Sequence, residues 1–195
     1  FLYRTDRDGF DYVYSVDDLA DLKGRKFQKK RNHVNRFRAE HSQFELQNLT
    51  GGNFSAAQHM VGEWYRARMQ ADPTGDYMME SIAMSRAFRH YEGLQMESAV
   101  LVENGEILAV TMGSRLWSDT FDIHFEKARE DVDGAYAAVN CEFARYLRLK
   151  YPNLRYLNRE DDVGLAGLRK AKLSYNPHHM VEKSWAYLAE DFHGD

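Results

Sequence analysis

An Asn-Gly pair between two apolar runs is the feature that most limits how this chain can fold. Residues 98–102 and 107–116 are both rich in apolar side chains, and only the four residues 103–106 (Glu-Asn-Gly-Glu) separate them. Asn-Gly suits the tight turn of a β-hairpin, because both residues accept the positive φ that such a turn needs. The sequence therefore predicts two antiparallel strands joined at Asn104 and Gly105.

A crossover unit follows the predicted hairpin. Residues 120–125 alternate in polarity and predict a third strand with Phe121, Ile123 and Phe125 on one face. Apolar residues then recur at helical spacing over 134–150, which predicts a long helix. The remaining predicted elements of this half are a buried strand at 154–157, a helix at 164–173 and a strand at 181–188.

The first half of the chain also predicts strands and helices in alternation. Ser15 is placed to cap a helix that begins with Asp17 and Asp18, since acidic residues in the first turn favour the helix dipole. Ser55 is placed in the same way before a later helix. The predicted elements are a strand at 10–14, the helix after Ser15, a strand at 44–49 and two helices between 55 and 91. The whole order predicts an α/β (α+β) fold, with a mixed sheet flanked by helices.

The composition excludes several classes of protein. A length of 195 residues suits about one domain. The single cysteine, Cys141, excludes an intrachain disulfide and a cysteine-based zinc site, and it fits a reducing cytoplasm. No apolar run approaches the roughly 20 residues that span a bilayer, so no membrane segment is predicted. Nucleotide-binding glycine motifs and the common zinc-ligand spacings do not occur, and no metal site is predicted. The chain starts with neither Met nor a signal peptide, so we expect a cytoplasmic fragment of a longer protein.

Residues 23–38 form a basic segment in an otherwise acidic chain. The segment holds eight Lys or Arg and no acid, whereas the whole chain has a net charge of -4. Phe27, Val34 and Phe37 recur at helical spacing, so one stripe can pack while the cations stay in solvent. The segment is either a solvated helix face or a contact for phosphates of RNA, lipid or cofactor. The candidate contacts are Arg25, Lys29 and Asn32.

Four stretches carry a resemblance to a known family. They are 22–33 (LKGRKFQKKRNH), 125–128 (FEKA), 158–162 (NREDD) and 167–177 (GLRKAKLSYNP). Together they resemble the family named after the C-terminal domain of phosphatidylglycerol lysyltransferase, a branch of the GNAT-like acyltransferases. The resemblance implies two tandem GNAT-like halves. Residues 1–41 would be the tail of a preceding half, and 42–195 a complete acyltransferase domain. The rest of the N-terminal GNAT-like half, its expected partner, would be missing from this fragment.

The same resemblance implies a chemistry and its participants. Lysyltransferases of this kind move an aminoacyl group from charged tRNA, whereas most GNAT enzymes use acyl-coenzyme A. We therefore expect a donor of one of these two kinds and a small-molecule acceptor with an amine or a hydroxyl. A transferase of this kind needs a held donor, a base and stabilisation of the oxyanion.

The segment 129–135 (REDVDGA) stands where GNAT enzymes hold the pyrophosphate of coenzyme A. Arg129, Gly134 and Ala135 match that pattern loosely and are the candidate cofactor-binding residues, but the middle glycine is missing. The three acids in between would repel a pyrophosphate. The alternative is an acidic helix start that the dipole favours.

The best candidate site follows the predicted strand that ends at Leu157. The sequence Asn-Arg-Glu-Asp-Asp comes directly after it, and α/β folds bind ligands at the carboxyl ends of strands. Glu160 or Asp161 would act as the base or bind the α-amino group of an aminoacyl donor, and Glu126 would face the same cleft. The alternative is a cap for the next helix. The candidate substrate-binding residues here are Asn158 and Arg159.

The last predicted helix departs from the GNAT pattern. Many GNAT enzymes place a general-acid Tyr there, but Lys170 stands at that position, and Tyr175 is the candidate substitute. Arg169 and Lys172 would bind phosphate, or else they only favour the dipole at the helix end. Two functions remain open: an acyl- or aminoacyltransferase, and a catalytically silent GNAT-like module that binds a ligand or a partner domain.

Overall fold

The computed structural model describes residues 1–75 and 77–189 of the chain. Its elements are β1 (Leu2–Thr5), the 3-10 turn η1 (Arg7–Gly9), β2 (Asp11–Ser15), α1 (Val16–Asp21), the 3-10 turn η2 (Arg25–Phe27), α2 (Gln28–Glu40), β3 (Glu45–Asn48), α3 (Phe54–Ala71), α4 (Met78–Arg89), α5 (Tyr91–Leu94), β4 (Glu97–Glu103), β5 (Glu106–Arg115), β6 (Thr120–Ala128), α6 (Ala135–Lys150), β7 (Tyr156–Asn158), α7 (Ala166–Leu173), β8 (His179–Val181) and β9 (Ser184–Tyr187).

One mixed sheet of seven strands organises the fold. Its order is β3-β4-β5-β6-β7-β2-β8. Only β6 and β7 are parallel among these pairs, and α6 connects them along the chain. The hairpin joins β4 to β5 with Glu103 opposite Glu106, as the Asn-Gly pair predicts. The predicted α/β order and the crossover are therefore confirmed.

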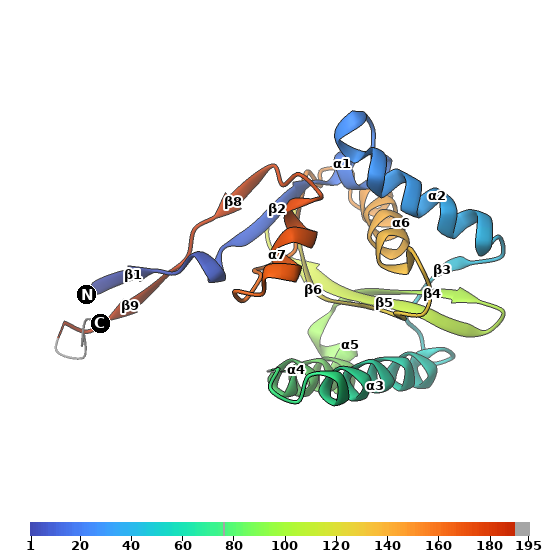
Figure 1. The fold of residues 1–195 in the computed structure, drawn as a ribbon, viewed down its shortest axis with the longest axis horizontal. Helices are drawn as coiled ribbons and strands as arrows, with labels where there is room; N and C mark the ends of the chain where they lie inside the picture. Colours follow the sequence, from blue (N-terminus) through green and yellow to red (C-terminus); the bar gives the residue numbers. More distant parts are fainter. Residues whose placement is uncertain (76, 190–195) are drawn as a thin grey trace.

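Helices cover both faces of this sheet (Figure 1). On one face α6 lies against the strands, and α1 and α2 pack on α6. On the other face α3 packs against β5 and β6, with α4 beside it. Strand β4 shows how the two layers arise: Leu101 packs with Val139 of α6, whereas Val100 packs with Met60 of α3. Successive side chains of a strand point to opposite faces, so an uninterrupted apolar run fits a strand covered on both sides.

A β-bulge interrupts β6 at His124. Met112 of β5 pairs with Phe125 and the next residue, Gly113, pairs with Ile123, so His124 is an extra residue in its strand. The bulge reverses the alternation of the side chains beyond it. Ile123 therefore packs in the α6 layer, while Phe125 packs against the α3–α4 cluster. The predicted common face for Phe121, Ile123 and Phe125 is wrong for Phe125, because period-2 alternation does not foresee a bulge.

Strands β6 and β7 separate soon after they meet. Their pairing runs from Thr120 with Tyr156 to Asp122 with Asn158 and ends there. Strand β6 continues to Ala128, paired only with β5. The second half of β6 and the residues after β7 therefore border a gap in the sheet, on which the candidate site is built.

The two chain ends differ from the sequence prediction. The expected single strand at 181–188 is two strands, β8 and β9, which pair with β2 and β1. Strand β1 was not predicted, because all four of its residues are exposed and show no alternation. Strands β1 and β9 form a two-stranded ribbon that extends from the body of the protein (Figure 1).

The helix caps are predicted correctly in one case out of two. The Ser15 side chain accepts a hydrogen bond from the Asp18 N–H, so this cap is confirmed. Ser55 lies inside α3, which begins at Phe54 after Asn53, so the predicted cap at Ser55 is wrong. The second predicted helix of this region is divided at His90 into α4 and α5.

The N-terminal segment is part of the same folded body. Strand β2 lies between β7 and β8, and α1 and α2 pack on α6. Phe27, Val34 and Phe37 are buried, as the basic segment predicts. Whether residues 1–41 derive from a preceding GNAT-like half stays a prediction.

We predict that Gly113 is essential to the bulge. A Cβ at this position would overlap the carbonyl oxygen of Asp122 and the ring of Phe121. Gly113→Ala should therefore lower the free energy of unfolding by roughly 1–3 kcal/mol. The control is Gly62→Ala in α3, where a Cβ meets nothing within 4 Å, and which should stabilise by about 0.5–1 kcal/mol. Urea unfolding of both variants tests this, and equal effects would contradict it.

Candidate functional site

The residues predicted from β6 and β7 meet at the gap between these strands. Arg159 Nη2 donates a hydrogen bond to Glu126 Oε1 at 2.8 Å, and the two side chains are only 14% and 8% exposed. Asn140 of α6 donates to the other Glu126 oxygen at 3.4 Å. Nη1 of Arg159 is buried and has no hydrogen-bond partner among the described residues. A buried donor without a partner is rare in proteins, and a ligand oxygen would satisfy it.

Aromatic rings enclose the Arg159 guanidinium. Its carbon lies 5.0 Å from the centre of the Tyr175 ring and 5.7 Å from that of Tyr14. The rings fix the plane of the guanidinium. Burial raises the pKa of Tyr175 to about 12, so its hydroxyl stays protonated at neutral pH, as the predicted general acid would require. Whether Tyr175 acts as an acid stays a prediction.

Two lysines add positive charge beside Arg159. Lys30 Nζ lies 3.9 Å from the centre of the Tyr175 ring. Lys172 Nζ donates to the carbonyl oxygens of Arg159 and Asp161, at 2.5 Å for the former. Burial, and after it the charge of Arg159, lower the pKa of each lysine to about 8. Arg159, Lys30 and Lys172 thus outnumber the Glu126 carboxylate. Their excess positive charge favours the binding of a negatively charged group.

The loop after β7 has a fixed shape. Asn158 accepts a hydrogen bond from the Glu160 N–H and donates to Asp11 at 3.0 Å. Glu160 has φ +53°, a left-handed conformation that is uncommon for residues other than glycine. Asp161 faces Lys183, with 3.5 Å between its Oδ2 and Nζ. Asn158 and Lys172 thus shape the loop, and their predicted contact with substrate stays a prediction.

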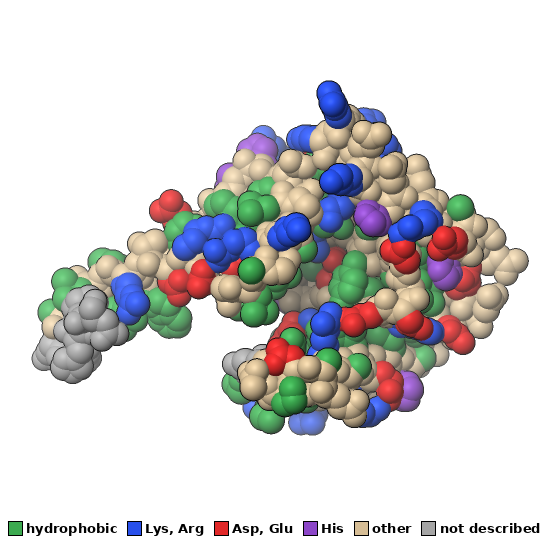
Figure 2. All heavy atoms as spheres, in the orientation of Figure 1, with side chains coloured by type: hydrophobic (Ala, Val, Ile, Leu, Met, Phe, Trp, Pro, Cys, Tyr) green, Lys and Arg blue, Asp and Glu red, His purple; other side chains and the backbone are tan. Residues whose placement is uncertain are grey.

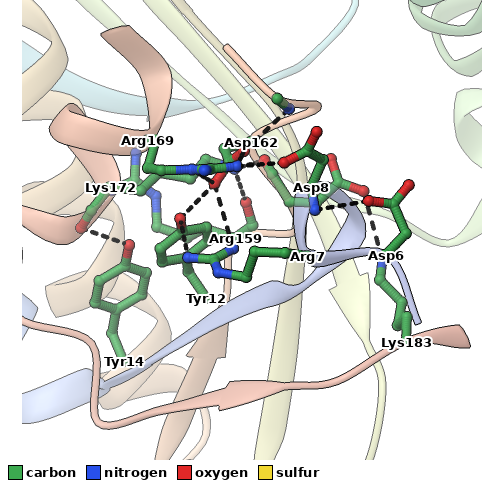
Figure 3. A network of polar contacts seen from close by, with 12 residues as sticks. Asp6, Arg7, Asp8, Tyr12, Tyr14, Arg159, Asp162, Arg169, Lys172 and Lys183 are labelled. Atoms are coloured by element: carbon green, nitrogen blue, oxygen red, sulfur yellow. Dashed lines mark hydrogen bonds and ion pairs between the residues drawn. The ribbon is translucent and has the colours of Figure 1, made fainter. Parts of the chain in front are cut away.

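A polar network fastens this loop to α7 and to the N-terminal segment (Figure 3). Asp162 is fully buried and accepts two hydrogen bonds from Arg169, at 2.7 and 2.9 Å, and another from Tyr12. Arg169 also pairs with Asp8, so two carboxylates engage the guanidinium that we expected to bind phosphate. The hydrogen bond from Arg169 holds the pKa of Asp162 well below its usual range.

A second polar group lies on β5, β6 and the loop, and the sequence did not indicate it. His124 Nε2 lies 2.8 Å from Ser114 Oγ, and its Nδ1 lies 3.1 Å from Glu160 Oε1. Asp122, His124 and Glu160 have ligand atoms within 4.8 Å of one another, and in the described part of the chain they are the group that could hold a metal ion. The only signal in the sequence is the polar alternation of 122, 124 and 126.

Each acid of the predicted pyrophosphate loop has a basic partner. Asp131 and Glu106 both pair with Arg129, at 2.7 and 2.8 Å. Glu130 pairs with Arg68 of α3, and Asp133 pairs with Arg36 of α2. The hydrogen bonds that Arg129 donates to Asp131 raise the pKa of Arg129. Arg129 is therefore engaged by carboxylates, and the acids connect the loop to α2, α3 and the hairpin.

The end of this loop lies against α2. Gly134 has φ +81°, and a Cβ there would meet the carbonyl oxygen of His33 at 2.8 Å. Ala135 begins α6 and is buried with Phe37. Both residues therefore have packing roles, and their predicted contact with a cofactor stays a prediction.

The basic segment presents unpaired cations on α2 and on the turn before it. Arg25, Lys29 and Asn32 are exposed, and their side chains make no hydrogen bond or ion pair with another described residue. Figure 2 shows Lys and Arg side chains over this region, and a hollow between the α3–α4 layer and the surface that carries α7. Lys30 of the same helix contacts the Tyr175 ring beside Arg159. The exposed cations of the basic segment therefore lie next to the cations around Arg159.

None of the described helices is both long and apolar enough to cross a bilayer.

The fold is similar to that of GNAT proteins. A tandem GNAT protein from the clavulanic acid biosynthesis pathway superposes with a TM-score of 0.50 at 7% identity, over 93% of this chain and 52% of that one. The chain belongs to the family described as phosphatidylglycerol lysyltransferase, C-terminal, whose sequence model matches residues 1–187.

Two solved structures are similar to this chain at higher TM-scores. A conserved protein of unknown function from Bacteroides thetaiotaomicron is 40% identical, with a TM-score of 0.87 over 94% of this chain and 60% of its own. L-PGS from Bacillus licheniformis is 17% identical, with a TM-score of 0.64 over 93% of this chain and 60% of its own. The chain thus spans about 60% of the length of these two relatives. The resemblance expected from the sequence is confirmed.

We predict that Asp162 stabilises the loop through its charge. Asp162→Asn removes the buried negative charge that faces Arg169 and should cost roughly 3 kcal/mol of unfolding free energy at pH 7. Asp8→Asn, at the exposed partner of Arg169, should change stability little. Because the pKa of Asp162 lies below its usual 3.8, its contribution is present above that pH and is lost as the pH falls below it. In urea unfolding, the difference in unfolding free energy between wild type and Asp162→Asn should become smaller from pH 5 to pH 2. A difference that stays constant over this pH range would contradict the prediction.

Proposed function

We propose that this chain transfers an aminoacyl group from tRNA to an amine or hydroxyl acceptor. The observation that carries the proposal is the buried Arg159, which Glu126 and two aromatic rings hold with one donor unpaired at the gap between β6 and β7. Family membership supports the same reaction class, since phosphatidylglycerol lysyltransferase, by its name, transfers lysine. Aminoacyl-tRNA is made in the cytoplasm, which agrees with the location expected from the sequence.

Such a transfer needs a hydrogen-bond donor that stabilises the developing oxyanion, and the Arg159 guanidinium is such a donor. The acceptor attacks the ester carbonyl that links the amino acid to the ribose, and negative charge develops on the carbonyl oxygen. A fixed, desolvated guanidinium N–H stabilises that charge more strongly than water does. The ester bond then breaks, and the ribose hydroxyl takes up the proton that the acceptor gave to the base.

Of the three acids predicted at this cleft, Glu160 is the best placed to act as a base. Its side chain is 44% exposed, and its Oε1 lies 3.1 Å from His124 Nδ1. Glu126 is engaged by Arg159 and Asn140, and Asp161 faces Lys183. Glu126 therefore orients Arg159, and Glu160 together with His124 accepts the proton of the acceptor.

The charges around the site favour tRNA over coenzyme A as the donor. Carboxylates engage Arg129, so the loop that binds pyrophosphate in GNAT enzymes has no free cation of its own. The exposed cations of α2, by contrast, lead to Lys30 and Arg159. Phosphates of a nucleic acid would bind there in a salt-dependent way.

A silent GNAT-like module is the alternative, and the engaged Arg129 is the observation that favours it. Such a module would bind a small ligand or the preceding GNAT-like half without transferring a group. It predicts no discharge of any aminoacyl-tRNA.

The test is the rate at which the chain discharges tRNA that carries radiolabelled amino acids. The acceptors are ethanolamine, glycerol and phosphatidylglycerol micelles, each in excess. Arg159→Lys should lower the transfer rate by about 100-fold, because lysine cannot keep the planar pairing while it donates to the carbonyl. Arg155→Lys, at an exposed position, is the matched control and should stay within about twofold. Wild-type protein that discharges none of the charged tRNAs would contradict the proposal.

A further inference from the structure

Three side chains at the gap hold one another in a line. Ser114 Oγ lies 2.8 Å from His124 Nε2, and His124 Nδ1 lies 3.1 Å from Glu160 Oε1. This is the order of a nucleophile, a base and an acid that orients the base. We propose that Ser114, His124 and Glu160 form a catalytic triad whose serine takes an acyl group from an activated ester.

Two neighbouring strands and the loop after β7 supply the three members. Ser114 of β5 lies opposite Asp122 of β6. His124 is the extra residue of the bulge, and bulges often re-aim a side chain next to a functional site. Glu160 follows β7 in a left-handed conformation with φ +53°, and backbone strain of this kind gathers at functional sites. The bulge and the loop conformation therefore both help to bring His124 and Glu160 into contact.

Ser114 is the member that a substrate would meet. Both ring nitrogens of His124 already have partners, Ser114 on one side and Glu160 on the other. The hydroxyl that faces His124 Nε2 is thus already in place, and it belongs to Ser114. Ser114 is half-buried and His124 is 29% exposed, so the group is not sealed in the core.

The charges that face His124 support its role as a base. Glu160 and Asp122 lie on its Nδ1 side, and the hydrogen bond that Glu160 accepts from His124 raises the pKa of His124 above its usual 6.5. Burial and the charges of Glu160 and Asp11 outweigh those of His124 and Lys183, and together they raise the pKa of Asp122 to about 6. The pair Glu160 and Asp122 would stabilise the imidazolium that forms when Ser114 gives up its proton.

The proposed step conserves atoms and charge. The Ser114 oxygen attacks the ester carbonyl while its proton passes to His124 Nε2. The C–O bond to the leaving alcohol breaks, and that alcohol takes the proton from His124. The product is an acyl ester on Ser114, which an acceptor amine or hydroxyl attacks in the same manner. With an aryl fluorophosphonate, the O–P bond forms and P–F breaks, so that fluoride and the proton leave.

The test uses an aryl fluorophosphonate, because this probe needs no aminoacyl donor and its outcome is separate from that of the proposed function. The protein is incubated with the probe at pH 8, and the adduct is followed by intact mass and located by peptide mapping. The variants are Ser114→Ala, His124→Gln and Glu160→Gln. Ser118→Ala, at an exposed serine of the next turn, is the matched control. Thermal unfolding shows whether each variant remains folded.

We expect one adduct, on Ser114, with no adduct in Ser114→Ala. The labelling rate should fall at least 100-fold in His124→Gln and about 10-fold or more in Glu160→Gln, and Ser118→Ala should behave as wild type. The rate should rise with pH through a pKa above 6.5, since only the neutral imidazole accepts the proton, and Glu160→Gln should lower that midpoint. Folded wild-type protein without an adduct, an adduct on another residue, or labelling that does not depend on His124 would each overturn the triad.

Discussion

The ion pair between Glu126 and Arg159 connects two strands beyond the point where their backbone pairing has ended. A sheet that opens leaves unpaired backbone groups, and side chains must cover the gap or a ligand must fill it. Here a carboxylate and a guanidinium span it, desolvated and enclosed by Tyr14 and Tyr175. Burying such a pair is costly unless its geometry is good, so the surrounding structure is organised to keep that geometry.

Much of the nearby architecture holds the loop that carries Arg159. Lys172 binds the carbonyl groups of this loop from α7, and Asp162 anchors the loop to Arg169 and to the N-terminal segment. The N-terminal strand β2 supplies Tyr12 and Tyr14 to the same region. The residues around the gap therefore come from both ends of the chain, and loss of either end would disturb the site.

The sequence predicted the part of the site that depends on strand ends. Glu126 was expected to face the same cleft as Arg159, because polar residues at the ends of neighbouring parallel strands share one edge. Glu126 instead lies inside β6, which continues to Ala128, and it faces Arg159 because the pairing of β6 with β7 ends at Asp122 and Asn158. Ser114 and His124 were missed, since their contact depends on the register of β5 with β6 and on a bulge that alternation does not reveal. Tyr12 and Asp162 are 150 residues apart, and no local pattern indicates such a pairing. The acids of the loop before α6 were visible as charge, but their basic partners on α2, α3 and the hairpin became clear only in the folded chain.

The central claim is that the gap accepts an aminoacyl group attached to a ribose, and ligand-induced thermal stabilisation tests it most directly. The ligands are an amide-linked 3′-aminoacylamino-3′-deoxyadenosine, which cannot be discharged, and acetyl-coenzyme A. A ligand at about 100 times its Kd stabilises the folded state by roughly 2.7 kcal/mol, which raises Tm by several degrees in a chain of this size. The account predicts a rise with the aminoacyl nucleoside, its loss in Arg159→Lys, and no rise with acetyl-coenzyme A. A rise with acetyl-coenzyme A alone would contradict it.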